Sequence, residues 1–362
     1  MNTNIFEDLF VLEMASNHQG NLARGLSIID QYAKIVRFNN IRAAIKLQFR
    51  DMDNFVHKDF VGREDIRYVK RVNDTKLTKN EFGTLVETIV RSGCIPMATP
   101  FDEKSVDWCV EFNMPIIKVA SADNNDWMLL EKIAKTRKPV IVSLGGLSQK
   151  DNDDLVLFFE HRNIPLALNH CVAAYPHEDA EAELNQIDFL RQRYPNLVIG
   201  YSCHEYHDWT SSVQIAHAKG ARTFERHVDI NDDGFEVAKY SSLPHQIDAW
   251  FKSWHKAREL CGASGAQRRA PLARETAYLD SYIRGVYAKR DLEKGQVLTE
   301  DDIYLSIPLQ KGQISCRELM LGKYGHHMLG DCKKDAPLTI DVLDTPYAHN
   351  AELKKSIYDR GL

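Results

Sequence analysis

The chain has 362 residues, of which 44% are hydrophobic and 27% are charged, and its formal net charge is −5. These values are typical of a globular protein with one large core and room for a small second domain. No basic stripe indicates nucleic-acid binding, and no apolar run approaches the roughly 20 residues that a membrane-spanning helix needs. We therefore expect neither nucleic acid nor a membrane as a partner.

Two further features of the sequence indicate the cellular compartment in which the protein is expected. The first ten residues, MNTNIFEDLF, are acidic and lack the basic and long apolar regions of a signal peptide. The seven cysteines are odd in number, and none forms a C-x-x-C motif, which argues against a disulfide framework. Both features predict a cytoplasmic protein.

Eight short apolar runs predict β-strands. They are mostly continuous rather than alternating, as in parallel strands that are buried on both faces. The runs are Leu9–Met14, Arg42–Gln48, Ile95–Ala98, Ile116–Ala120, Pro139–Ser143, Ile164–His170, Leu197–Tyr201 and Arg222–Val228.

Helical patterns separate these runs. Thr78 and Glu81 form a capping box in front of an apolar stripe that includes Phe82, Leu85 and Ile89. Eight successive βα units predict an α/β fold of the (β/α)8 TIM-barrel class. A doubly wound open sheet is the alternative, and the absence of G-x-G-x-x-G in the first turn disfavours a dinucleotide-binding version of it.

The pattern divides the chain into four parts. We expect a barrel over 1–262, a polar linker over 263–282, a small β-rich module over 283–345 and a C-terminal tail over 346–362. Within the barrel, the long connection Phe49–Leu77 has the length of a lid or binding loop.

Polar residues stand at the ends of all eight predicted strands, at the barrel end where TIM-barrel active sites form. Lys46, Lys118, Ser121 and Ser143 supply the cations and hydroxyls that a phosphate needs. Other polar residues in these positions are Glu13, Gln48, Thr99, Asp102, Asn169, Tyr175, His204 and His227. The two histidines follow neighbouring strands and could share one metal ion, while Glu13 and Asp102 offer an acid or base.

These strand-end motifs resemble the sialic acid synthase family, whose members make N-acetylneuraminate and related nonulosonates. The matching stretches are Glu13-Met-Ala-Ser-Asn-His-Gln-Gly20, Ala44-Ile-Lys-Leu-Gln48, Ala98-Thr-Pro-Phe-Asp102, Lys118-Val-Ala-Ser121, Gly200-Tyr-Ser-Cys-His204 and Glu225-Arg-His227. Residues Arg284–Leu343 resemble the antifreeze-like (SAF) domain that ends those synthases.

The resemblance implies a transferase that condenses phosphoenolpyruvate with an aldose, such as an N-acylmannosamine, and depends on Mn²⁺ or Mg²⁺. It also implies a domain-swapped homodimer. By motif match, His204 and His227 are metal ligands and Glu13 handles a proton or the cationic intermediate. The residues implied to bind substrate are Lys46, Gln48, Thr99, Lys118, Ser121, Ser143, Asn169, Tyr175 and Glu236, the last in place of a family aspartate.

The sequence also departs from the family pattern. Cys203 stands where the family has aspartate, and Ile307 stands where it has an arginine that contacts the sugar's N-acyl group. Isoleucine cannot donate a charge-assisted hydrogen bond, so we expect an altered sugar pocket. Two alternatives remain open: a Schiff-base pyruvate aldolase with Lys46 or Lys118 as nucleophile, and a non-catalytic carbohydrate-binding homologue.

Overall fold

The computed structural model describes residues 3–262, 265–321, 325–344 and 349–362. The chain divides into two compact units, Met1–Gly262 and Ala263–Leu362. The predicted boundary at 345/346 involves residues outside those described, so the structure does not place it. No helix in the described ranges is long and apolar enough to cross a membrane.

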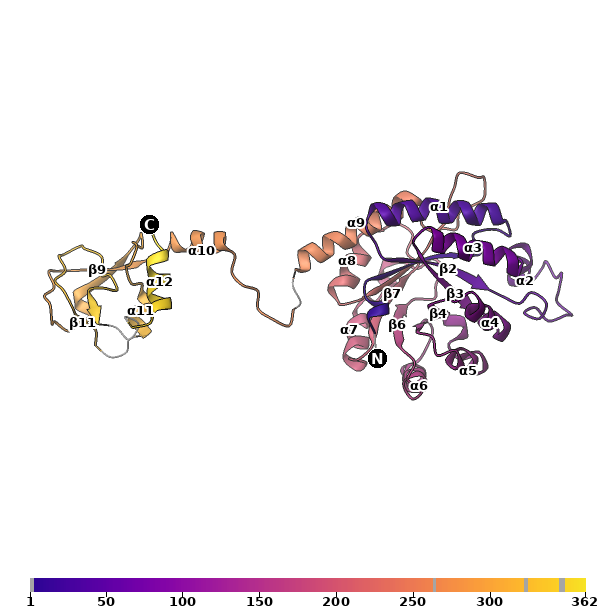
Figure 1. The fold of residues 1–362 in the computed structure, drawn as a ribbon, viewed down its shortest axis with the longest axis horizontal. Helices are drawn as coiled ribbons and strands as arrows, with labels where there is room; N and C mark the ends of the chain where they lie inside the picture. Colours follow the sequence, from indigo (N-terminus) through magenta and orange to yellow (C-terminus); the bar gives the residue numbers. More distant parts are fainter. Residues whose placement is uncertain (1–2, 263–264, 322–324, 345–348) are drawn as a thin grey trace. The chain divides into compact units, whose positions relative to one another are not determined.

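The first unit is a closed barrel of eight parallel strands that pair in chain order (Figure 1). The TIM-barrel prediction is confirmed, and each predicted strand has its counterpart with ends shifted by at most two residues. The strands are β1 Leu9–Ala15, β2 Ala43–Phe49, β3 Ile95–Pro100, β4 Ile116–Val119, β5 Val140–Ser143, β6 Leu166–Cys171, β7 Val198–Cys203 and β8 Thr223–His227.

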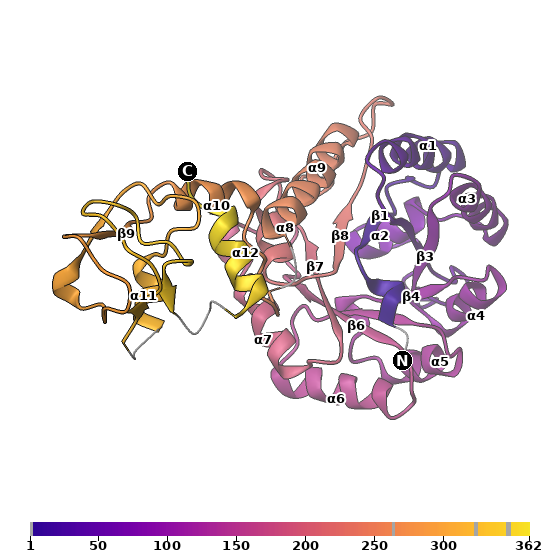
Figure 2. The same ribbon diagram turned by 60° about the vertical axis from the view of Figure 1, so that its left-hand side comes forward.

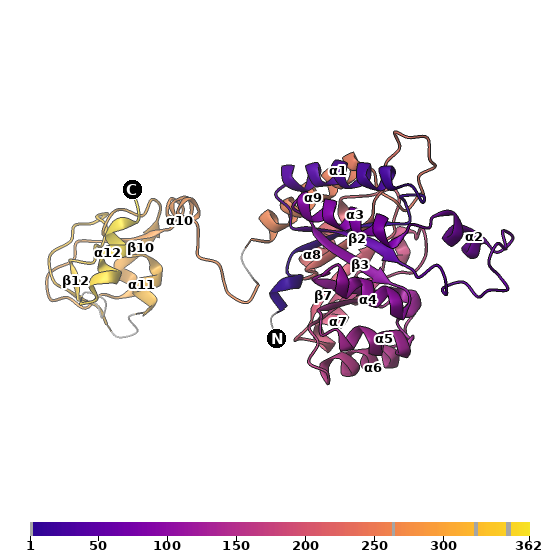
Figure 3. The same cartoon turned by 45° about the vertical axis from the view of Figure 1, so that its right-hand side comes forward.

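Helices surround this barrel (Figure 2). They are α1 Leu22–Phe38, α3 Lys79–Arg91, α4 Glu103–Glu111, α5 Trp127–Lys135, α6 Gln149–Glu160, α7 Asn185–Arg193, α8 Ser211–Ala218 and α9 Pro244–Cys261. The predicted capping box of Thr78 and Glu81 begins α3. The long connection after β2 carries one more helix, α2 (Arg67–Asp74), which stands away from the ring of helices (Figure 3).

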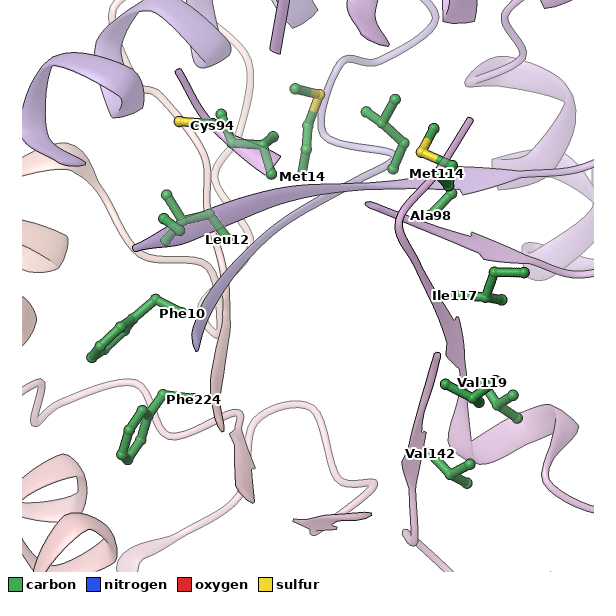
Figure 4. Close-up of a cluster of buried hydrophobic side chains, with 14 of the residues drawn as sticks. Phe10, Leu12, Met14, Cys94, Ala98, Met114, Ile117, Val119, Val142 and Phe224 are labelled. Carbon is green, nitrogen blue, oxygen red and sulfur yellow. The ribbon is translucent and has the colours of Figure 1, made fainter. Parts of the chain in front are cut away.

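Successive side chains of each strand point to opposite sides of the barrel wall. On β1, Phe10, Leu12 and Met14 belong to the apolar layer between strands and helices (Figure 4). Leu9 and Val11 belong to a separate apolar cluster with inward-facing residues of other strands. Glu13 continues this second set, so the inward row changes from apolar to polar as it reaches the carboxyl end of the strand.

The second unit has its own small core. Its described strands are β9 Gly285–Ala288, β10 Ile303–Ser306, β11 His327–Met328 and β12 Leu343–Asp344, which pair as two antiparallel hairpins. Its helices are α10 Ala273–Asp280, α11 Cys316–Leu321 and α12 Ala351–Asp359. The buried residues are Val286, Ala288, Leu292, Ile314, Met328, Cys332, Leu338, Ile340, Leu343 and Ile357.

Two segments differ from their prediction. The linker interval includes α10, a short helix with no buried residue. The interval predicted as a tail includes α12, whose Ile357 is buried in the core of the second unit. Beyond α12, Arg360 pairs with Glu318 at 2.6 Å. The C-terminal segment is therefore part of the second unit, because two apolar positions, Leu353 and Ile357, give an otherwise polar helix a face to bury.

Candidate active site

A cavity of about 590 Å³ opens at the carboxyl ends of the barrel strands. Its volume is in the range of small-molecule sites. Ten predicted site residues line it: Glu13, Lys46, Gln48, Thr99, Lys118, Ser121, Ser143, Tyr175, His204 and His227. Strand register brings them together, since Glu13 lies beside Lys46 of β2 on one side and His227 of β8 on the other.

The base of the cavity holds two carboxylates around one lysine. Lys46 forms ion pairs with Glu13 and, at 3.4 Å, with Glu225, and its Nζ donates to Thr99 Oγ1 at 3.1 Å. Burial lowers the pKa of Lys46 to about 8, against the opposing charge of Glu225. Glu13 Oε1 and Glu225 Oε2 are buried without a hydrogen-bond partner among the described residues. Each carboxylate therefore keeps one oxygen available for a ligand or proton.

A second lysine is oriented by its neighbours. Lys118 Nζ donates to Ser143 Oγ at 2.7 Å and to the Val119 carbonyl at 2.8 Å. Burial works against an ionised Glu225, but the charges of Lys118 and Lys46 hold the pKa of that carboxyl below its usual value. Ser121 Oγ accepts a hydrogen bond from the Gly145 amide at 3.2 Å. This wall thus combines one cation with two hydroxyl groups, a set suited to a phosphate.

The two predicted metal ligands lie next to each other. The ring centroids of His204 and His227 are 5.4 Å apart. Burial lowers the pKa of His204 to about 4 and that of His227 well below its usual value, so both rings are neutral near pH 7. His204 Nδ1 donates to the Val172 carbonyl at 2.9 Å, which leaves the Nε2 lone pair free.

These two imidazoles fit a divalent metal ion. A neutral ring with its second nitrogen fixed by a carbonyl is the usual form of a histidine ligand, and His204 has this form. His227 is also neutral, and its Nδ1 is buried without a hydrogen-bond partner among the described residues. Within the described ranges there is no group of three or more His, Cys, Asp or Glu residues that could hold a metal. The pair would therefore supply two ligands and leave the remaining positions to water and substrate, as an open catalytic site requires.

Two predicted substrate-binding residues do not reach the cavity. Asn169 is fully buried, and its Oδ1 accepts a hydrogen bond from Thr223 Oγ1 at 2.6 Å. Glu236 instead lines an adjacent outer pocket together with Arg67 and Tyr240. Asp102, considered as an acid or base, caps α4 by accepting from the Ser105 amide at 2.7 Å. Asn169 and Asp102 are thus engaged in holding the fold.

The sequence analysis assigned no role to several residues that line the cavity. Glu225 shares the inward row of β8 with His227, so the alternation of that strand could have identified it. Arg50, Arg67 and Arg71 also line the cavity, and no strand pattern points to them because they lie in the long connection after β2. Tyr240, from the loop after β8, completes this side of the cavity.

The substitution at Cys203 is accommodated in the wall of the barrel. Its buried thiol lies 3.5 Å from Arg226, whose guanidinium pairs with Glu205 at 2.9 Å. Glu205 therefore supplies the charge that a buried arginine requires. Ile307 lies in the second unit and is 57% exposed.

Comparison with known proteins identifies the family, because residues 35–265 match the NeuB family. The chain belongs to this family. N-acetylneuraminate-9-phosphate synthase of Drosophila melanogaster is 36% identical over 354 residues, covering 91% of this chain and 94% of the relative. The resemblance to sialic acid synthases is thereby confirmed, and the protein is an enzyme, a transferase of the sialic acid synthase type.

Solved structures agree with the barrel and the family. The putative spore coat polysaccharide biosynthesis protein E of Chromobacterium violaceum superposes with a TM-score of 0.89 at 36% identity, covering 93% of this chain and all of that one. The sialic acid synthetase of Leptospira borgpetersenii, solved with citrate, has a TM-score of 0.64 at 27% identity and covers 75% of this chain and 90% of its own.

Proposed function

We propose that the enzyme condenses phosphoenolpyruvate with an aldose to give a 3-deoxy-2-keto sugar acid and inorganic phosphate. C3 of phosphoenolpyruvate attacks the aldehyde carbon and forms the new C–C bond, while the aldehyde oxygen takes up a proton. Water then adds at C2, and phosphate leaves as the C2–O bond breaks. The observation that carries this proposal is the convergence of ten strand-end side chains on one cavity in a chain of the NeuB family.

Phosphoenolpyruvate would bind against the lysine and serine side of the cavity. Lys118 and the hydroxyls of Ser143 and Ser121 offer a cation and donors for the phosphate. Lys46, which also pairs with Glu13 and Glu225, would contact the carboxylate of phosphoenolpyruvate, with Thr99 and Gln48 beside it. Because burial lowers the pKa of Lys46 to about 8, the Schiff-base alternative has to be tested by experiment.

The aldose would bind toward the histidine side, next to Tyr175. The ring centroids of Tyr175 and His204 are 4.0 Å apart. A sugar that stacks on the Tyr175 ring would therefore have its aldehyde close to both histidines. A divalent cation such as Mn²⁺ or Mg²⁺ held by His204 and His227 would polarise the aldehyde as a Lewis acid. The histidines themselves serve to hold that ion in place and remain neutral.

The carboxylates Glu13 and Glu225 would manage protons at C2. Each has one oxygen free of any partner among the described residues. A water held between them can lose its proton to one carboxylate as it adds to the cationic carbon, and the second carboxylate stabilises that positive charge. Glu13 is the residue predicted for this role, and Glu225 extends it.

We also propose that the second unit is an SAF domain and that the enzyme forms a homodimer in which this domain serves the partner's site. Its separate core of short antiparallel strands supports the first point. Sedimentation of the full chain, which measures its mass in solution, tests the second. A monomer at enzyme-assay concentrations would contradict it.

Phosphate release from phosphoenolpyruvate tests the function directly. The assay uses the full chain with Mn²⁺ or Mg²⁺ and a panel of aldoses with and without an N-acyl group. The proposal predicts release only when metal, phosphoenolpyruvate and a suitable aldose are all present. Borohydride trapping of pyruvate on a lysine, in protein freed of metal, would instead establish the aldolase alternative.

A further inference from the structure

One buried arginine lies between two residues of the active site. Arg226 separates Glu225 from His227 on β8, and its side chain lies on the other side of the barrel wall because successive strand residues alternate. Glu225 and His227 line the cavity, whereas Arg226 does not. The side chain of Arg226 is completely buried, so its charge needs a partner within the protein.

Arg226 has this partner in the segment that follows β7. Its Nη1 donates to Glu205 Oε1 at 2.9 Å, and its Nη2 donates to the Glu205 carbonyl at 2.6 Å. Its Nε donates to Ser242 Oγ at 2.7 Å. Glu205 directly follows His204, and Arg226 directly precedes His227. The contacts between Glu205 and Arg226 therefore join the chain neighbours of the two histidines, and we call this pair the Glu205–Arg226 clamp.

The carboxylate of Glu205 is held on both of its oxygens. It is buried, and its Oε1 also accepts a hydrogen bond from the Ser212 hydroxyl. Its Oε2 accepts from the Tyr201 hydroxyl at 3.5 Å. Glu205 does not line the cavity, and in contrast to Glu13 and Glu225 it keeps no oxygen free for a ligand or proton. Its contacts point to a role in placing other residues.

The backbone of His204 is held from a second direction. Its amide donates to His177 Nε2 at 3.3 Å, and His177 Nδ1 donates to the Glu178 carbonyl at 3.0 Å. The ring of His204 is held separately, by the Val172 carbonyl. These contacts all come from the segment after β6. The Glu205–Arg226 clamp is the contact that ties this part of the chain to β8 and thus to His227.

Position 203 offers a second place for the partner of Arg226. The Cys203 thiol is 3.5 Å from Arg226 Nη1, the same nitrogen that donates to Glu205. Position 203 departs from the family pattern, which has aspartate there, whereas Arg226 belongs to a stretch that keeps the pattern. An aspartate side chain extends one bond further than that of cysteine. A carboxylate at position 203 would therefore reach the same guanidinium.

We propose that the Glu205–Arg226 clamp fixes the spacing of His204 and His227, and that Glu205 replaces an aspartate at position 203 as the partner of Arg226. This inference rests on the proposed function, since it takes the two histidines as metal ligands. Glu205 is a positioning residue, because it acts through Arg226. Without the charge of Glu205, the guanidinium would be buried unpaired, and the ends of β7 and β8 would lose the contact that holds them in register.

Binding of Mn²⁺ alone tests the clamp without turnover, with the free ion measured by electron paramagnetic resonance. In the full chain, Glu205→Gln keeps the shape and removes the charge. We expect the Kd for Mn²⁺ to rise about tenfold or more. The Tm should fall by about 10 °C, because Arg226 is left buried without a counter-charge. A lowered Tm with an unchanged Kd would show that the pair only holds the fold, and would overturn the positioning role.

A rescue variant tests the exchange of positions. In Cys203→Asp, Glu205→Gln the carboxylate moves by two residues, and we expect the Kd and the Tm to return close to the wild-type values. Cys203→Asp alone places two carboxylates at one guanidinium and should lower the Tm. The matched control is Cys203→Asn, Glu205→Gln, which has the same shape without the charge and should not recover.

The comparison of the two double variants remains decisive even if Glu205→Gln alone does not fold. An aspartate variant that binds Mn²⁺ no more tightly and melts no higher than the asparagine control would overturn the exchange. Rescue of both values by aspartate alone supports it, because packing is the same in the two variants and only the charge differs.

The same measurements separate this inference from the proposed function. If the wild type binds Mn²⁺ and aspartate rescues binding, but no aldose supports phosphate release, the clamp stands and the condensation fails. If the wild type catalyses the condensation and Glu205→Gln keeps the wild-type Kd, the clamp fails and the function stands. A wild type that does not bind Mn²⁺ overturns the metal site and, with it, the positioning role.

Discussion

The base and the edge of the cavity carry charge in opposite ways. At the base, Lys46 is buried between Glu13 and Glu225, and Lys118 is fixed by a serine and a carbonyl. At the edge, Arg50, Arg67 and Arg71 form no ion pair with a carboxylate among the described residues, and Arg67 and Arg71 lie on the largely exposed helix α2. A buried charge has lost its water and must be paired with an opposite charge within the protein. An exposed charge stays hydrated and can pair with a ligand when the ligand binds. We therefore expect the chemical steps at the base of the cavity and contacts that select the substrate at its edge.

The largest expected effect comes from removing the phosphate-binding cation. Lys118→Ala should lower kcat/KM for phosphoenolpyruvate about 1,000-fold, since its charge faces the developing phosphate in a buried site. Steady-state kinetics measures this, and circular dichroism checks the fold. Lys135→Ala, at the exposed end of α5, is the control. A loss of less than about tenfold would show that phosphoenolpyruvate binds elsewhere.

Glu225→Gln tests the carboxylate to which the sequence analysis gave no role. The amide keeps the shape but cannot take up a proton, so we expect kcat to fall about 100-fold with KM for both substrates nearly unchanged. Glu103→Gln, in the first turn of α4 on the surface, should leave kcat unaltered. Full activity of Glu225→Gln would restrict the proton chemistry to Glu13.

The lowered pKa of Lys46 predicts a pH dependence of phosphoenolpyruvate binding at the base of the cavity. The lowered pKa of about 8 means that Lys46 loses its charge as the pH rises through that value. KM for phosphoenolpyruvate should then rise about tenfold per pH unit above about pH 8. Lys46→Arg, which stays charged, should move this rise to higher pH if the variant folds. A KM that is constant up to about pH 10 would contradict the assignment.

The smallest effect on catalysis is expected at Asn169, which the sequence placed in the site and the structure places beneath it. Asn169→Ala removes the hydrogen bond to Thr223 and should lower the free energy of unfolding by about 1–3 kcal/mol. KM for either substrate should change by less than about twofold, since the side chain is buried away from the cavity. Urea denaturation measures the free energy of unfolding of this variant, and steady-state kinetics measures its KM values. A raised KM with unchanged stability would restore the substrate-binding role.

Much of the barrel could be predicted because its strands are buried on both faces, so each of them is a nearly continuous apolar run in the sequence. Their strand-end positions and the family motifs placed ten of twelve predicted site residues on the cavity. The alternation of side chains along a strand does not say how deep an inward residue lies. For that reason Asn169 was assigned to the site, although its amide is hydrogen-bonded to Thr223.

The features that the sequence analysis did not identify depend on tertiary contacts. Arg67 and Arg71 face the cavity only because the connection after β2 folds over that side, and local sequence does not encode that path. Helix α12 is mostly polar, and its Ile357 becomes a core residue only against the strands of the second unit. Both cases depend on contacts between segments far apart in the chain.

A crystal structure of the full chain with phosphoenolpyruvate and Mn²⁺ tests the division between base and edge most directly. The account predicts the phosphate of phosphoenolpyruvate within hydrogen-bonding distance of Lys118 and Ser143, the metal on His204 and His227, and Arg67 and Arg71 without contact to phosphoenolpyruvate. Phosphoenolpyruvate bound at Arg67 and Arg71, or Mn²⁺ away from the two histidines, would contradict it.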